Sequence, residues 1–231
     1  MAAGKENLQA IAQRRLYPHL TDSSYLVLRA RRIIFNNWLK QFPGELNVLD
    51  IGGRYQPYRP LLNGRIRRYT AVDIMPTELV DVLASGEALP FPAETFDLVI
   101  VTQVFEYFAQ PLEAARQIHA VLKSGGALLM SAVAFAPRFV SEERWRFNPA
   151  GIRTLLASFS NIEIVPEVHS PAGLIRSLNL FMDYFVPTPP LKKLCGLTLC
   201  PIFNLLGLLT EGLQLSQNDQ FTANYCVLAK K

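Results

Sequence analysis

Short apolar runs alternate with turns and helix-like segments through the middle of the chain. The runs cover residues 46–51, 68–73, 96–101 and 127–131, and each is apolar at consecutive positions rather than at every second one. This pattern indicates strands that are buried on both faces, as in a parallel sheet covered by helices. A helical segment from Pro111 to Leu122 separates the last two of them. The sequence therefore predicts an α/β fold.

The C-terminal third continues this pattern and then interrupts it. A helix is expected from Pro149, capped by Asn148, and strands are expected at 162–165 and 221–229. The stretch between those strands is much longer than the usual connection of about 4–6 residues. We therefore expect residues 168–220 to have a structure and purpose of their own.

The N-terminal 43 residues read as an arm followed by a basic helix. The sequence up to Leu20 has no strong apolar period and predicts a loose arm. From Ser23 apolar residues recur at helical spacing as far as Phe42, and Asp22, Ser23 or Ser24 are available as caps. Two interpretations of this helix's basic side chains remain open: a solvated face, or a contact with an anionic membrane or phosphate. These side chains are Arg29, Arg31, Arg32 and Lys40.

Composition excludes several classes of protein. Of 231 residues 50% are hydrophobic and 18% charged, and the net charge is +4. A disordered or fibrous chain is excluded, and the low charge suggests apolar surface held against a membrane or a partner. The charge excess is too small and scattered for a nucleic-acid partner. Three cysteines without metal-site spacing, and a start without an apolar signal core, predict a reducing cytoplasmic location and no metal site.

A glycine turn follows the first strand. Its sequence, Asp-Ile-Gly-Gly-Arg-Tyr at residues 50–55, lacks the second and third glycines of the dinucleotide fingerprint G-x-G-x-x-G. The phosphate-loop pattern G-x-x-x-x-G-K-[ST] is absent as well. Because ligands of parallel sheets bind at the carboxyl ends of strands, this turn is still the expected binding edge. A nicotinamide or flavin enzyme is disfavoured.

Four blocks of sequence together resemble class I S-adenosylmethionine (SAM) methyltransferases of the small-molecule branch called type 11. The blocks are VLDIGGRYQPY at 48–58, YTAVDI at 69–74, EALPFPAETFDLVIVTQVFEYF at 87–108 and AVLKSGGALLMSAV at 120–133. The resemblance implies a Rossmann-like, mainly parallel seven-stranded sheet whose last strand is antiparallel. The resemblance is specific over residues 46–133, weaker to about 185 and absent before 44. We therefore expect a methyltransferase domain at 44–231, an added arm and helix at 1–43, and, from the length of the last connection, an apolar cap insertion at 168–220.

The same resemblance implies a set of SAM-binding residues. Asp73 would bind the ribose hydroxyls, and Arg54, standing where the family generally has a third glycine, would either bind the methionine carboxylate or obstruct the site. Ser85 replaces a common Asp, which puts the adenine contact in question. The implied cofactor residues are Asp50, Gly52, Gly53, Arg54, Asp73, Ile74, Glu87, Ala88, Leu89, Gln103 and Val104.

Catalytic and acceptor-binding candidates follow the fourth and fifth strands. If the acceptor is a hydroxyl it must lose a proton, and the candidate bases are Glu106, Tyr107, Glu142, Glu143 and His169, each at least as well explained as a surface or capping residue. Of these we expect Glu106, Tyr107 or His169 to be catalytic. Arg144, Trp145 and Arg146 would bind an anionic, ring-containing acceptor, or Trp145 would anchor the next helix. The expected reaction is methyl transfer from SAM to an O or N atom of a small molecule, glycan-related or lipid-linked.

An uncharged segment at 194–210 follows Lys192 and Lys193. A membrane span needs about 20 apolar residues, and Pro201 and Asn204 interrupt this shorter run. We therefore expect a pair of cap helices, with 192–212 contacting substrate, a peripheral membrane surface or a second subunit of a homodimer. A catalytically inactive, methyltransferase-like binding or assembly protein at a membrane surface is the alternative function.

Overall fold

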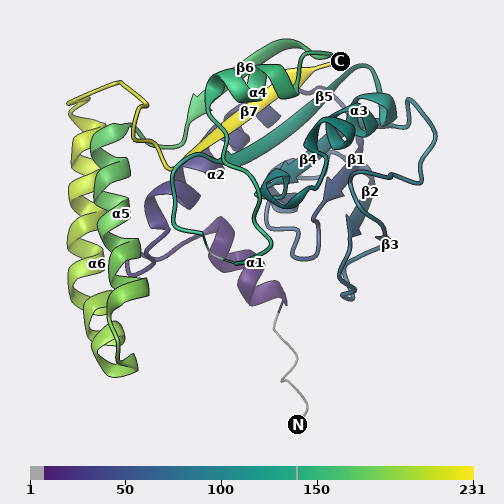
Figure 1. Cartoon of the computed structure of the whole chain (residues 1–231). Coiled ribbons are helices and arrows are strands. Elements are labelled where there is room, and N and C mark those ends of the chain that lie inside the picture. Colours follow the sequence, from purple (N-terminus) through teal and green to yellow (C-terminus); the bar gives the residue numbers. More distant parts are fainter. Residues whose placement is uncertain (1–7, 139) are drawn as a thin grey trace.

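The computed structural model describes residues 8–138 and 140–231 and contains a seven-stranded sheet (Figure 1). The spatial order is β3-β2-β1-β4-β5-β7-β6, and only β7 runs antiparallel to its neighbours β5 and β6. The strands are β1 (Leu46–Ile51), β2 (Ile66–Asp73), β3 (Val82–Leu83), β4 (Phe96–Thr102), β5 (Leu122–Val133), β6 (Ser160–Pro166) and β7 (Asn224–Lys230). The predicted fold class is confirmed.

Helices cover both faces of this sheet. The helices are α1 (Leu8–Leu16), α2 (Tyr25–Leu39), α3 (Pro111–Val121), α4 (Pro149–Leu155), α5 (Ser170–Phe185) and α6 (Pro189–Gly212), with short 3-10 turns η1 (Arg59–Leu62) and η2 (Phe105–Tyr107). Successive residues of β4 point to opposite faces of the sheet. Val99 packs in the core with α3 and α4, and Ile100 packs in the core with α2. Burial on both sides explains the continuous apolar runs of the sequence.

Two expectations about the N-terminal region were wrong, and one was confirmed. The described part of the arm is not loose but forms helix α1, whose only fully buried side chain is Leu16, so its apolar period is too weak to recognise. Ser24, one of the three expected caps, is the N-cap of α2 without a side-chain hydrogen bond, and Asp22 forms an ion pair with Arg14. Arg31 does not belong to a solvated face, because it is buried in an ion pair with Glu167. Residues 1–7 lie outside the described part of the chain.

The insertion between β6 and β7 forms a hairpin of two long helices. Figure 1 shows α5 and α6 side by side, beside the sheet rather than across it. The expected interruption of the apolar segment was wrong, since α6 runs continuously through Pro201 and Asn204. Asn204 is buried there, and its amide donates to the backbone oxygens of Leu20 and Asp22. This contact joins the hairpin to the segment before α2.

Candidate functional site

The register of the sheet brings the ends of β1, β2 and β4 to one edge. Ile51 is paired with Val72 on one side and Val101 on the other. The glycine turn, Asp73 and Gln103 therefore follow neighbouring strands at the same edge. This is the place where parallel sheets bind their ligands.

The two glycines of the turn are required by close contacts. Gly52 has φ +78°, and a Cβ there would lie 2.3 Å from Val104 Cγ2. A Cβ on Gly53 would lie 2.7 Å from the carbonyl oxygen of Asp50. Both glycine amides donate to the carbonyl oxygen of Val72, at 2.8 and 3.1 Å. These glycines thus fix the turn against β2 and β4.

Asp50, at the end of β1, is buried and hydrogen-bonded to β2. Its carboxylate is 4% exposed and accepts a 2.6 Å hydrogen bond from the Tyr69 hydroxyl. Burial raises the pKa of Asp50 to about 7, the Tyr69 hydrogen bond opposes that rise, and the negative charge of Asp73 adds to it. Its role is structural as well as electrostatic, because it holds β2 beside the turn.

Asp73 is the carboxylate that a ligand can reach. One oxygen accepts the Met75 amide at 2.9 Å, and no described residue donates to the other. The next side chain, Ile74, is 74% exposed. A carboxylate oxygen beside an exposed apolar side chain suits a ribose next to an adenine ring.

Arg54 stacks on the ring of the neighbouring Tyr55. Its guanidinium carbon is 4.9 Å from the centre of the Tyr55 ring, and that of Arg15 from α1 is 4.5 Å from the same ring. Such stacking holds a guanidinium by its face and leaves its edge donors available. A carboxylate can be bound in that arrangement.

Several implied cofactor residues have other contacts. Glu87 accepts hydrogen bonds from the Gln110 amide at 2.6 Å and from Ser85, so its carboxylate anchors the start of α3. Leu89 is buried in the core, whereas Ala88 is exposed. These contacts restrict any adenine contact here to the backbone and Ala88.

Gln103 marks a strained point at the end of β4. Its φ is +55°, a left-handed conformation that is uncommon for a residue other than glycine. Its amide donates to the Ser131 carbonyl at 3.0 Å, and Val104 then packs against Gly52. Strain of this kind concentrates at functional sites.

Comparison with known proteins agrees with this geometry. Residues 49–130 match the family model described as a methyltransferase domain. This match confirms the resemblance of the segment to type 11 methyltransferases. No curated protein matches the sequence.

Solved structures share the fold at low identity. A SAM-dependent methyltransferase from Archaeoglobus fulgidus is 15% identical with a TM-score of 0.56, over 91% of this chain and 95% of that one. Haemonchus contortus phosphoethanolamine N-methyltransferase 2 is 15% identical with a TM-score of 0.53, over 95% and 60%. The [4+2]-cyclase SpnF is 17% identical with a TM-score of 0.55, over 86% and 80%. The fold alone therefore does not fix the reaction.

The side chains at this edge fit SAM, the cofactor that the resemblance implies. Asp73 presents an acceptor for the ribose hydroxyls, and Arg54 presents donors for the methionine carboxylate. The glycine turn and Val104 form a compact floor without a side chain projecting from Gly52.

Glu106 is a buried carboxylate in η2, which follows β4 at the sheet edge that carries the glycine turn and Asp73. We call this edge the cofactor edge. Oε1 accepts the Val133 amide at 2.5 Å, whereas Oε2 is buried without a hydrogen-bond partner among the described residues. Burial raises the pKa of Glu106 to about 7, against the opposing effect of the backbone hydrogen bonds. A carboxylate with this pKa and one unused oxygen is suited to accept a proton near neutral pH.

We expect the pKa of Glu106 to be visible in stability. The native carboxyl keeps its proton up to about pH 7, whereas the unfolded one loses it near 4.5. The native state then binds more protons between these values, so stability falls as pH rises through that window, by about 1.4 kcal/mol per pH unit at most. Urea unfolding at pH 5, 6, 7 and 8 should show this loss in the wild type relative to Glu106→Gln. Parallel pH profiles of the two proteins would contradict the raised pKa of Glu106. Asp50 also has a raised pKa, but it is present in both proteins, so its contribution cancels in the comparison.

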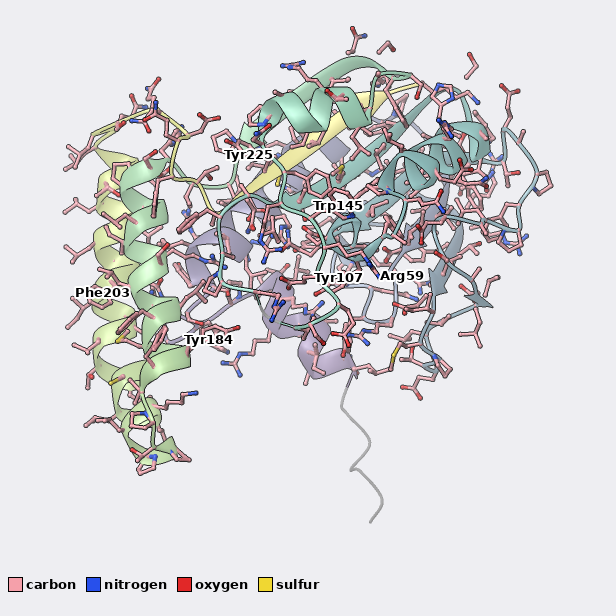
Figure 2. The ribbon with its side chains drawn as sticks, viewed as in Figure 1. Arg59, Tyr107, Trp145, Tyr184, Phe203 and Tyr225 are labelled. Carbon is pink, nitrogen blue, oxygen red and sulfur yellow. The ribbon has the colours of Figure 1, made fainter. Side chains whose placement is uncertain are left out.

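Tyr107 directly follows Glu106 in η2, and the backbone of Trp145 is hydrogen-bonded to the same turn; Figure 2 labels both aromatic side chains. The Tyr107 hydroxyl is exposed and donates to Glu143 Oε1 at 3.5 Å, and burial of part of the ring raises its pKa. Trp145 donates its indole hydrogen to the Phe108 carbonyl at 2.7 Å, and its backbone amide donates to the Glu106 carbonyl. Trp145 is therefore an anchor as well as a 41% exposed ring surface.

The remaining candidates are distributed differently. Arg146 donates to Glu143 Oε2 at 2.6 Å and to the Pro137 carbonyl, so it organises its own loop, whereas Arg144 is exposed. His169 lies at the start of α5, where Nδ1 is 3.0 Å from Glu211 Oε2 of α6. This interaction of His169 closes the base of the hairpin and engages neither Glu106 nor Tyr107.

Sequence reasoning missed a buried polar cluster between α2, α5 and β6. Glu167 follows β6 and binds Arg31 Nε at 2.5 Å and Nη2 at 3.1 Å. Asn224 donates to the same carboxylate at 2.8 Å, and the Tyr58 hydroxyl lies 3.4 Å from Arg31 Nη1. A signal existed, because Arg31 lies one helical turn from both Val27 and Phe35, within the apolar stripe of α2.

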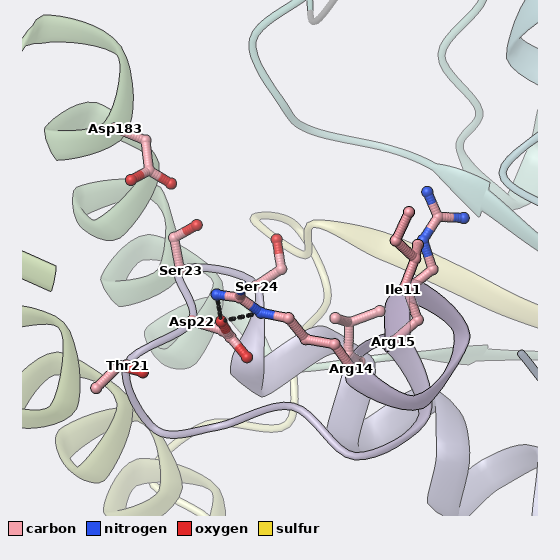
Figure 3. A pocket seen from close by; sticks show the side chains of 9 residues that line it. Ile11, Arg14, Arg15, Thr21, Asp22, Ser23, Ser24 and Asp183 are labelled. Carbon is pink, nitrogen blue, oxygen red and sulfur yellow. Dashed lines mark hydrogen bonds and ion pairs between the residues drawn. The ribbon is translucent and has the colours of Figure 1, made fainter. Parts of the chain in front are cut away.

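A cleft opens beside this cluster (Figure 3). It has a volume of about 360 Å³ and lies between α1, the segment before α2, and the end of α5. Its lining residues are Ile11, Arg14, Arg15, Thr21, Asp22, Ser23, Ser24, Leu28 and Asp183. None of the residues implied for SAM binding lines this cleft.

Proposed function

We propose that this domain transfers a methyl group from SAM to an O or N atom of a small acceptor, which binds between the cofactor edge and helices α1, α2 and α5. The observation that carries the proposal is the accessible carboxylate of Asp73 beside the glycine turn. SAM supplies an electrophilic methyl group, and in-line displacement needs alignment more than a reactive side chain.

The chain's own residues would divide the work as follows. Asp73 and Arg54 orient the cofactor through its ribose and its carboxylate. Gln103 and Val104 hold the end of β4 beside the turn. Glu106 Oε2 accepts a proton when the acceptor is a hydroxyl, and Trp145 offers an apolar ring surface.

We expect Asp73→Ala to weaken binding of S-adenosylhomocysteine about 10- to 150-fold, the equivalent of about 1.5–3 kcal/mol for hydrogen bonds to a charged group. Isothermal titration calorimetry measures this directly. Glu78→Ala removes a carboxylate from the following loop and should leave affinity unchanged. If the wild type binds no S-adenosylhomocysteine at millimolar concentration, the inactive binding protein replaces the enzyme as the leading function. Equal affinity of Asp73→Ala and wild type would contradict the ribose assignment.

A membrane location and a lipid-linked acceptor form the second part of this proposal. The hairpin of α5 and α6 exposes an unusually large apolar surface for a soluble domain. Its exposed large apolar side chains are Leu174, Leu178, Phe181, Tyr184, Phe185, Leu191, Leu194, Leu197, Leu199, Ile202, Leu205, Leu206 and Leu209. By length and composition alone α6 would suffice for a membrane span, with a mean hydropathy of 1.6.

The charges around the hairpin favour a bilayer surface over a second protein subunit. Lys192 and Lys193 are exposed in the first turn of α6, and the chain carries a net charge of +4. Exposed lysines beside a leucine surface match an anionic membrane interface, whereas lysine is depleted from protein interfaces. We therefore propose that the hairpin lies along the surface of an anionic membrane. The free thiols of Cys195, Cys200 and Cys226 support a cytoplasmic side.

A further inference from the structure

Arg176 of α5 is a buried cation that the protein does not pair. The residue is 4% exposed, and Nε and Nη1 have no hydrogen-bond partner within the described residues. Burial lowers the pKa of Arg176 to about 10, so the guanidinium remains charged at neutral pH. A buried donor without an acceptor is costly, and a charged donor more so.

The neighbouring charges do not neutralise Arg176. Glu167 is the nearby carboxylate, but Arg31 and Asn224 already bind both of its oxygens. The trio of Arg31, Arg176 and Glu167 therefore has one positive charge in excess. Replacing such a charge with an apolar side chain is often stabilising. Features that reduce stability concentrate at functional sites, and an unpaired buried guanidinium is suited to bind an anion.

The unused polar atoms concentrate on this side of the molecule. Among described residues, the buried side-chain atoms without partners belong to Glu106, Arg176 and Asn179. Arg31 is the common neighbour of this region, since its charge acts on both Glu106 and Arg176. Asn179 Oδ1 lies one helical turn beyond Arg176 and needs a donor.

By helical spacing, the residues of α2 and α5 that line the cleft of Figure 3 share a helix face with Arg31 and Arg176. Asp183, which lines it, follows Arg176 by two helical turns, and Leu28 precedes Arg31 by one. Arg31 and Arg176 do not line this cleft, so a ligand that enters there would have to pass between the two helices to reach them.

We propose that Arg176, supported by Arg31, binds an anionic group of the acceptor, a phosphate or a carboxylate. The inference rests on the proposed function, because it names the chemistry of the acceptor in that site. Asn179 Oδ1 would accept a hydrogen bond from a hydroxyl of the same molecule. Arg176 is then a binding residue, and Glu106 remains the group closest to the cofactor edge.

Binding of simple anions to the full chain tests this proposal. Inorganic phosphate, acetate and monomeric dihexanoyl phosphatidic acid are titrated separately by calorimetry into wild type, Arg176→Gln and Arg176→Met. We expect at least one anion to bind the wild type and to bind both variants at least about 10-fold more weakly. Preference for phosphate over acetate would name the group, and preference for the lipid phosphate would name a lipid-linked source. Arg68→Gln removes an exposed arginine from β2 and should bind like the wild type.

Two further measurements separate a binding role from a structural one. The midpoint of thermal unfolding of Arg176→Met should rise by about 2 °C or more, because an unpaired buried charge is removed. S-adenosylhomocysteine affinity should stay within about twofold of the wild type in both variants. Equal anion binding by wild type and variants, or no anion binding by the wild type, would overturn the inference. A loss of stability in both variants would also overturn it, whereas absent S-adenosylhomocysteine binding in the wild type would defeat the proposed function alone.

Discussion

The substitution Gly52→Ala is expected to destabilise the protein by about 2–4 kcal/mol and to reduce S-adenosylhomocysteine affinity at least about 10-fold. The new Cβ would lie 2.3 Å from Val104 Cγ2, and the backbone would have to keep φ at +78°. Relief of the contact must move either the turn or the end of β4, which together form the cofactor floor. Urea unfolding and calorimetric titration measure the two effects.

Gly64→Ala is the matched control for this prediction. Gly64 also has φ +78°, but nothing lies within 4 Å of the position that a Cβ would take, so only backbone strain of about 1 kcal/mol is expected. Adding Val104→Ala to Gly52→Ala should recover part of the lost stability, because it removes the contact and leaves the strain. Equal costs for Gly52→Ala and Gly64→Ala would show that Val104 does not constrain the turn.

The triple substitution Leu194→Glu, Leu197→Glu and Leu205→Glu in α6 is expected to reduce binding to vesicles of phosphatidylcholine with phosphatidylglycerol at least about 100-fold. Each of these leucines is more than half exposed, at 56%, 59% and 53%. Burial of one leucine in an apolar phase contributes about 1.5–3 kcal/mol, and a carboxylate near anionic lipid is repelled. Vesicle co-sedimentation of the triple variant measures the change.

The control variant for the vesicle experiment carries glutamate at Leu83 and Leu112, which are 62% and 51% exposed on β3 and α3. It should sediment like the wild type. Light scattering after gel filtration, without lipid, distinguishes the other occupant of the hairpin surface. A wild-type dimer that the triple variant converts to a monomer, with unchanged vesicle binding, would refute the membrane proposal in favour of a second subunit.

The strands and the cofactor edge could be predicted from sequence because they depend on local signals. Buried strands need apolar residues at consecutive positions, and the glycine turn and Asp73 must follow particular strands. The two-residue strand β3 carries no such signal, because neither of its residues is buried. The cofactor roles of individual side chains remain predictions, and the observed contacts of Glu87 and Leu89 show why: the same spacing also serves α3 and the core.

The acceptor side could not be predicted in the same way. Arg31 pairs with Glu167 across 136 positions of sequence, and no local pattern announces such a pair. His169 is suited to catalysis by residue type, whereas its observed partner is Glu211 at the hairpin base. Arg176 lies in a helix, and the charged groups around it come from α2 and the end of β6. Its missing partner can be recognised only once all three elements are placed.

The position of β7 sets an order of events during folding. β6 has no neighbour in the sheet other than β7, which follows the entire α5–α6 hairpin in the chain. A growing polypeptide can therefore form the β1–β5 half early, but β6 must wait until β7 has left the ribosome. During that interval the leucine-rich helices are already synthesised while the sheet beside them is incomplete. Such long-range closure slows folding and exposes apolar segments, so chaperones or a nearby membrane would meet the hairpin before the sheet is finished.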